Sequence, residues 1–149
     1  LHFYDRAIEV TRKINHKIVL CSSLIEKGLV LIKMKKVVEL LIVEEEALTL
    51  AKELGNPDLL FNARTLEIRA LHLNGRTNEA LVLLNELQEQ DLSTEQQAEA
   101  AYIRFRLLPV DKTAYDLATR LFKELYAATP QYLYKTRLEK LKKEREDQG

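Results

Sequence analysis

Apolar residues recur at steps of three and four along most of this 149-residue chain. One such series runs through Leu59, Ala63, Leu66, Ala70 and Leu73. An α-helix turns by about 100° per residue, so this spacing gathers apolar side chains on one face, whereas a half-buried strand alternates at every second residue. No stretch of the sequence sustains that alternation. The sequence therefore predicts an all-α protein.

Local signals mark where the helices begin and end. In "LGNPDLL", Gly55 can adopt the left-handed conformation that ends a helix, Asn56 can cap the next helix, and Pro57 suits its first position. The segment Ser93–Gln96, "STEQ", is a capping-box pattern, and the Thr129–Pro130 pair is expected to open the last helix. Eight helices are predicted, at about residues 2–15, 17–33, 37–54, 57–73, 77–90, 94–108, 112–128 and 131–146.

Charge and composition narrow the class of protein. The 23 basic and 23 acidic residues balance, which argues against nucleic-acid binding because phosphate contacts require a basic excess. Apolar runs such as "VVELLIV" are far shorter than the roughly 20 residues that span a bilayer. The single cysteine, Cys21, and the lack of a signal peptide suit a reducing compartment. We expect a cytoplasmic protein without a membrane partner and, because it begins with Leu1, a fragment of a longer chain.

The helical pattern also repeats at a longer interval. Ala7, Leu40, Ala80 and Ala118 each lie early in a predicted helix, at spacings of 33, 40 and 38 residues. The residues four and seven positions later in each helix are Thr11 and Ile14, Glu44 and Ala47, Leu84 and Leu87, and Phe122 and Leu125, and apart from Glu44 they are apolar or small. Each unit of this repeat contains two helices.

These units resemble the tetratricopeptide repeat, a helix–turn–helix unit of about 34 residues. Gly28 matches the small residue of its first helix, where another helix packs closely, and Ala47 matches its closing alanine. Later units match at Gly75, Glu79 and Ala80, and at Tyr102, Phe105, Ala118, Phe122, Leu125 and Pro130. The resemblance implies a right-handed superhelix of antiparallel helical hairpins, a single domain over 1–149. Its parts are a half unit (1–15), three units (17–54, 57–90 and 94–128) and a terminal helix (131–146).

The chain also departs from the repeat pattern. It has no tryptophan, Ile68 and Arg106 replace small residues, and its later units are longer than the standard one. Another right-handed array of helical hairpins, or an irregular helical bundle, remains an alternative. In the last helix Tyr134 and two leucines share one side, while the other faces carry basic residues including Arg137. We expect that helix to be a solvating cap or the start of a linker.

The sequence offers little for catalysis, cofactors or metals. The glycines are isolated, so no phosphate loop is expected, and the three histidines are too dispersed for a zinc site. Cys21 lies on an apolar stripe and is expected in the core. Glu44–Glu46 are consecutive and should fan out around a solvated face, and the lysines at 33, 35 and 36 are read as a solubilising turn.

The resemblance implies that first helices line an inner groove. On the helix at 57–73, Asn62, Thr65, Arg69 and His72 form a polar stripe, and Arg104 is expected on the neighbouring wall. Further residues expected there are Ser22, Ile25 and Leu29 on one side and Ile103 on the other. Arginine can hold a carboxylate through two parallel hydrogen bonds. The lysine and asparagine pattern of the family's carboxylate clamp is not matched.

We therefore expect a non-catalytic domain that binds a protein or peptide, with an acidic or C-terminal peptide as one option, inside a larger signalling or regulatory protein. The alternative is a sensor segment that binds a small ligand and relays it to an attached effector domain. An enzyme with a cryptic site is a third hypothesis. Homo-oligomerisation is left open.

Overall fold

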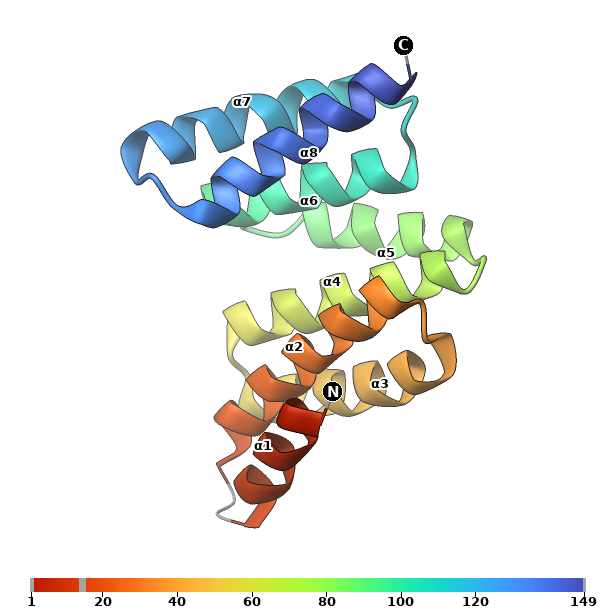
Figure 1. Ribbon diagram of the computed structural model, residues 1–149, viewed down its shortest axis with the longest axis vertical. Helices are drawn as coiled ribbons and strands as arrows, with labels where there is room; N and C mark the ends of the chain where they lie inside the picture. Colours follow the sequence, from red (N-terminus) through yellow and green to blue (C-terminus); the bar gives the residue numbers. More distant parts are fainter. Residues whose placement is uncertain (1, 14–15, 149) are drawn as a thin grey trace. The chain divides into compact units, whose positions relative to one another are not determined.

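The computed structural model describes residues 2–13 and 16–148, and every regular element within that part of the chain is a helix (Figure 1). The helices are α1 (His2–Lys13), α2 (Lys17–Met34), α3 (Val37–Leu54), α4 (Pro57–Leu73), α5 (Thr77–Gln88), α6 (Thr94–Leu107), α7 (Lys112–Ala128) and α8 (Tyr132–Gln148). The all-α prediction is confirmed. The expected end of the first helix at residue 15, and the repeat position at Ile14, lie outside the described residues.

The helix boundaries follow the predicted caps closely. Asn56 Oδ1 accepts from the backbone N–H groups of Asp58 and Leu59 at 3.0 and 3.1 Å. Ser93 and Gln96 form the reciprocal capping box at the start of α6. Thr129 differs from the prediction. It ends α7, where its N–H donates to Leu125 O at 2.9 Å, and α8 begins only at Tyr132.

The turn between α2 and α3 has a lysine, not a glycine, in the left-handed conformation. Lys35 ends α2 in the left-handed region at φ 55°, and its N–H donates to Ile32 O at 3.1 Å. Gly55 takes the same conformation at φ 62°, as its position in the sequence predicted. The side chains of Lys33, Lys35 and Lys36 are exposed, in keeping with a solubilising turn.

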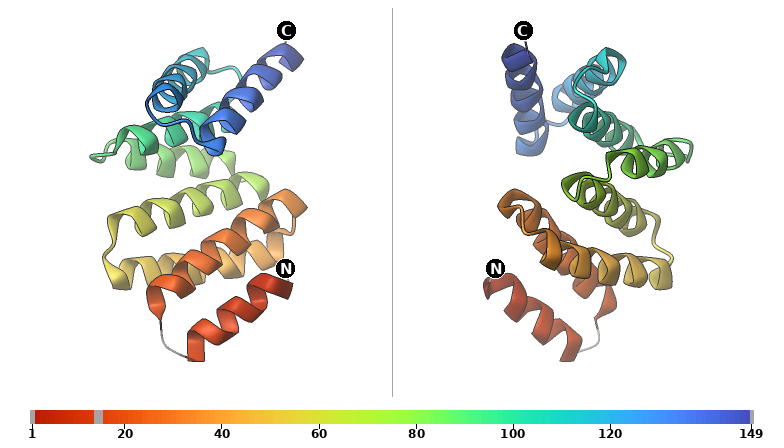
Figure 2. Two further views of the ribbon diagram at one scale, coloured as in Figure 1. Left: turned by 60° about the vertical axis from the view of Figure 1, so that its left-hand side comes forward. Right: turned by 90° about the vertical axis from the view of Figure 1, so that its right-hand side faces the viewer.

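The chain forms two compact units, residues 1–83 and 84–149, with the boundary inside α5. In the first unit α2 and α4 run in the same direction and α3 runs back against both (Figures 1 and 2). Cys21 is fully buried there, as predicted, and its Sγ donates to Ala47 O at 3.4 Å. The superhelix over 1–149, with its half unit, three units and terminal helix, stays a prediction.

The second unit has a core built from α6, α7 and α8, and aromatic rings make much of it. Tyr102 contacts Phe122 edge-on at 6.4 Å between ring centroids, and Phe122 contacts Tyr134 at 6.1 Å. Tyr134 and Leu141 of α8 are buried, so the predicted apolar side of the last helix packs on this core.

Candidate binding surface

Gly28 brings α2 unusually close to α4. A Cβ atom at residue 28 would lie 2.6 and 2.7 Å from the two Cδ atoms of Leu66, which is too near for any real side chain. Leu66 is itself fully buried, so it has little room to withdraw. The close crossing predicted at Gly28 is confirmed, and the helix it meets is α4.

This crossing fixes which side chains of the two helices share a solvent face. Leu29 and Ser22 lie about 100–120° around α2 from Gly28, in the opposite sense from Lys27, which pairs with Asp5 of α1. Asn62 and Arg69 lie about 40–60° around α4 from Leu66, in the sense opposite to that of Leu29 and Ser22 around α2. Because α2 and α4 run in the same direction and face each other, these positions fall on the same side of the pair. We call this surface the α2–α4 wall and define it by residues that lie on this side of the two helices: Ile18, Ser22, Leu29 and Lys33 on α2, and Asn62, Arg69 and His72 on α4.

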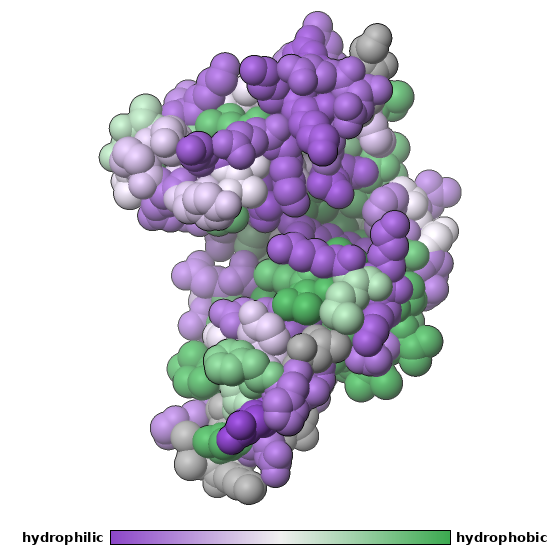
Figure 3. Space-filling model, viewed as in Figure 1, coloured by the Kyte–Doolittle hydropathy of each residue, from purple (hydrophilic) through white to green (hydrophobic). Residues whose placement is uncertain are grey.

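The wall has an apolar component on α2. Ile18 is 57% exposed and Leu29 is 39% exposed, while Ile25 between them is buried. In the space-filling view, hydrophobic surface lies over α2 among hydrophilic residues (Figure 3). The wall therefore offers both apolar area and hydrogen-bonding groups.

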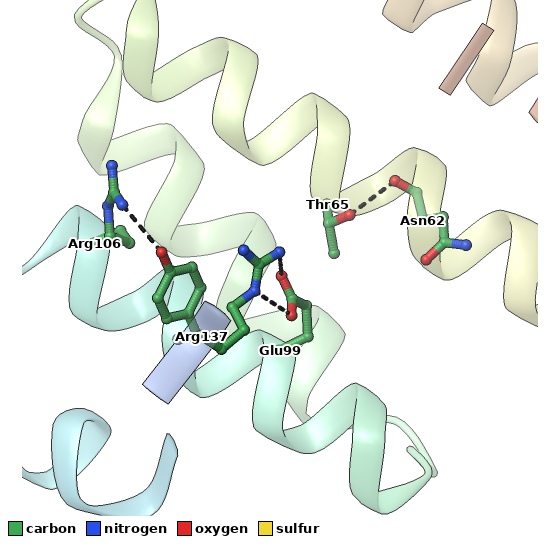
Figure 4. A network of polar contacts seen from close by, with 6 residues as sticks. Asn62, Thr65, Glu99, Arg106 and Arg137 are labelled. Carbon is green, nitrogen blue, oxygen red and sulfur yellow. Dashed lines mark hydrogen bonds and ion pairs between the residues drawn. The ribbon is translucent and has the colours of Figure 1, made fainter. Parts of the chain in front are cut away.

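The four predicted residues of α4 differ in what they present. Asn62 is exposed, whereas Thr65 is buried and its hydroxyl donates to Asn62 O at 2.8 Å (Figure 4). Thr65 therefore supports the helix and offers its hydroxyl to the backbone. Arg69 is half-buried and has a contact of its own. His72 is exposed, with Nδ1 2.9 Å from Thr77 Oγ1, which orients the ring.

Arg104 belongs to the second unit and is occupied within it. Its Nε donates to Gln88 Oε1 at 3.0 Å, and its Nη2 contacts Asn85 Oδ1. These bonds hold α6 to the C-terminal part of α5. Ile103, which was also expected on the wall, is buried. The predicted meeting of Arg69 and Arg104 on one wall stays a prediction.

Charge on the wall is unevenly distributed along the helices. Lys33, Arg69 and His72 lie toward the C-terminal ends of α2 and α4, and Glu26 lies at the middle of α2. Basic groups at helix C-termini complement the negative end of the helix dipole, so part of this asymmetry is structural. It also makes one end of the wall suitable for an anionic group.

Glu44 corrects the prediction of a solvated acidic face. Its side chain is buried in α3, with 9% exposed, while Glu45 is exposed. It lies on the stripe Leu40, Glu44, Ala47, Ala51, whose other three members are fully buried. The repeat alignment set Glu44 at the same offset as Leu84 and Phe122, which are both fully buried, so the burial of Glu44 follows the repeat.

Arg137 corrects the prediction that α8 presents its basic residues to solvent. Its Nε and Nη2 donate to Glu99 of α6 at 3.1 and 2.8 Å (Figure 4), and its guanidinium lies 4.6 Å from the ring centre of Tyr102. Arg106 of α6 donates to Tyr102 Oη at 3.0 Å and pairs with Glu144 at 2.7 Å. The helix is thus fastened to α6 by polar contacts.

Sequence reasoning missed one apolar surface, on α1. An open pocket is lined there by His2, Phe3, Arg6, Ala7 and Val10, and Phe3 and Val10 are 76% and 58% exposed. The steps of four and three from Phe3 through Ala7 to Val10 could have indicated it.

Other chemistry finds little support in the described residues. Burial raises the pKa of the Cys21 thiol, which disfavours the nucleophilic thiolate. Within residues 2–13 and 16–148, no group of three or more His, Cys, Asp or Glu side chains is placed to bind a metal ion. None of the described helices is long and apolar enough to cross a bilayer.

Comparisons with family models, with curated proteins and with solved structures find no match for this chain. The tetratricopeptide resemblance therefore rests on the residues that suggested it.

Proposed function

We propose that this chain is a tetratricopeptide-like, non-catalytic domain that binds a peptide on the α2–α4 wall, within a larger signalling or regulatory protein. The observation that carries the proposal is the crossing of Gly28 over Leu66. It joins the exposed faces of two parallel helices into one surface. A peptide laid along that surface could contact both helices at once.

The side chains of the wall favour a peptide that combines apolar and acidic residues. Leu29 and Ile18 provide exposed apolar area on α2. Asn62 can donate to and accept from a peptide backbone. Lys33, Arg69 and His72 favour a carboxylate at the end of the wall where these helices finish, whether it is an acidic side chain or a chain terminus.

The test uses defined peptides and fluorescence anisotropy. One labelled peptide has alternating apolar and acidic residues and a free C-terminal carboxylate, a second is its C-terminal amide, and a third has lysine in place of each acidic residue. The first should bind and the third should not. A weaker affinity for the C-terminal amide than for the free carboxylate peptide would show that the wall recognises the terminal carboxylate itself.

Two wall variants and one matched control complete the design. Arg69→Glu and Leu29→Asp should each weaken binding by about tenfold or more, since one reverses charge and the other places a carboxylate on apolar area. Arg120→Glu on α7 is the control, because Arg120 is exposed and lies in the second unit. A melting curve for each variant confirms that it is folded. Equal binding by the folded wall variants, or no binding of any peptide by wild type, would contradict the proposal.

A further inference from the structure

A buried carboxyl group lies where α3 packs against α4. Glu44 of α3 is 9% exposed and lies on the core stripe of that helix, between Leu40 and Ala47. Burying a charged carboxylate costs free energy unless it is paired, whereas the protonated form is cheaper to bury. The protonation state of Glu44 therefore bears directly on how well these helices pack.

The charged groups around Glu44 offer it little compensation. The charges that act on it are those of Glu67 and Arg64 on α4 and of Glu45 on its own helix. Arg64 Nη1 donates to Glu67 Oε1 at 3.2 Å, so the positive charge near Glu44 is already paired with the carboxylate of Glu67. The neighbouring helix α2 presents no charged residue on its buried face. That face consists of Leu20, Cys21, Leu24, Ile25, Gly28 and Leu31.

The direction of the effect follows from these neighbours. Burial, together with the smaller effects of Glu67 and Glu45, raises the pKa of Glu44 from an ordinary value of 4.5 to about 7, and Arg64 acts in the opposite direction. The carboxyl group is therefore protonated in the folded protein under mildly acidic conditions and ionised under mildly basic ones. Ionisation introduces an additional negative charge beside Glu67.

We propose that Glu44 is a proton-dependent joint between α3 and α4, which pack tightly while its carboxyl group is neutral and loosen when it ionises. Because α4 carries Asn62, Arg69 and His72, loosening at this joint would disturb the α2–α4 wall. Only that last consequence rests on the proposed binding function. The joint itself is tested without any ligand.

The sign of the pH dependence is specific. A group whose pKa is raised on folding binds more protons in the folded state, so folding is favoured at low pH. The Glu44 contribution is complete below about pH 4.5, is lost as the pH rises toward 7, and is absent above that. The resulting change in the equilibrium between folded and opened forms is on the order of a hundredfold.

Two measurements on the full chain test the joint. Carboxyl ¹³C NMR should give Glu44 a titration midpoint near 7, and Glu67→Gln should lower that midpoint because it removes the like charge. Amide hydrogen exchange in α3 and α4, corrected for the intrinsic pH dependence, should show opening that increases between pH 5 and pH 8. Glu44→Gln should abolish that increase, whereas Glu45→Gln on the exposed neighbour should retain it.

The outcomes separate clearly. A Glu44 midpoint near 4.5 would overturn the proposal, as would an unchanged increase in opening in Glu44→Gln. If Glu44→Gln fails to fold, the titration midpoints of Glu44 in wild type and in Glu67→Gln still test the proposal. Failure of peptide binding on the wall would leave both ligand-free readouts unaffected.

Discussion

Arg137 on α8 donates two hydrogen bonds to Glu99 on α6, and the same guanidinium lies over the ring of Tyr102. The two charged side chains are only 16% and 17% exposed. Burial lowers the pKa of the Arg137 guanidinium, but the Glu99 carboxylate stabilises the charged guanidinium by hydrogen bonding and charge, and the net effect is a raised pKa. A mostly buried, bidentate pair of this kind depends on both partners, because either one alone would be a poorly solvated charge.

Arg137→Ala should therefore lower the free energy of unfolding by about 2–4 kcal/mol, measured by denaturant titration. Arg137→Lys should recover only part of that loss, because an ammonium group cannot form the planar double contact. Arg120→Ala is the matched control: Arg120 pairs with Glu124 on an exposed face, and its loss should cost about 0.5 kcal/mol or less. Equal costs for Arg137 and Arg120 would show that the pair with Glu99 is incidental.

The crossing of α2 over α4 gives a second prediction. Gly28→Leu should destabilise the protein by about 1–3 kcal/mol, because the added side chain overpacks against Leu66. The double variant Gly28→Leu with Leu66→Ala should show a favourable coupling, since the second change opens room for the first. A denaturation midpoint that rises in Gly28→Leu would indicate that the crossing is looser than the structure shows.

The left-handed residue at the end of α2 gives a third prediction. Lys35→Gly should raise the free energy of unfolding by about 0.5–1 kcal/mol, because glycine adopts a φ near 55° without the steric cost that a Cβ imposes. Lys33→Gly, two residues earlier and inside the helix, is the control and should lower it by about 0.5–1 kcal/mol. Thermal unfolding of both variants checks the sign, and two changes of the same sign would contradict it.

The buried thiol gives a fourth prediction. Because burial raises the pKa of Cys21, its thiolate is scarce, and no solvent path reaches it. A thiol reagent such as an aromatic disulfide should leave the native protein unlabelled at pH 8 and label it fully in denaturant. Rapid labelling of the folded chain would mean that α2 and α3 separate readily around the bond from Cys21 Sγ to Ala47 O.

The sequence predicted best where the signal is local. Asn56, Ser93 and Gln96 cap their helices with bonds to residues two or three positions away, and such bonds depend on little beyond the local segment. The apolar steps placed Cys21 in the core for a similar reason, since one helical stripe determines which face is buried.

Prediction was weaker where a distant residue decides. Arg137 looked like a solvated charge because its partner, Glu99, lies 38 positions earlier. Glu44 looked solvated because its neighbours are acidic, although its place on the apolar stripe of α3 governs its burial. The bond from Arg104 Nε to Gln88 Oε1 was likewise not visible in the sequence, and the predicted role of Arg104 in binding stays a prediction. For the two arginines the charge was visible in the sequence and its spatial partner was not, whereas for Glu44 the deciding signal was the apolar stripe itself.

The boundary inside α5 has a consequence for synthesis on the ribosome. Only residues 77–83 of this 12-residue helix belong to the first compact unit. A helical segment that short does not persist alone, because isolated helices need roughly 12–15 residues to be even marginally stable. The core around Cys21 and Leu66 is built from residues of α1 to α4, so the nascent chain can bury it before α5 is complete. The finished helix then gives the emerging second unit an ordered start, so the two units should fold in sequence, with α5 as the step that links them.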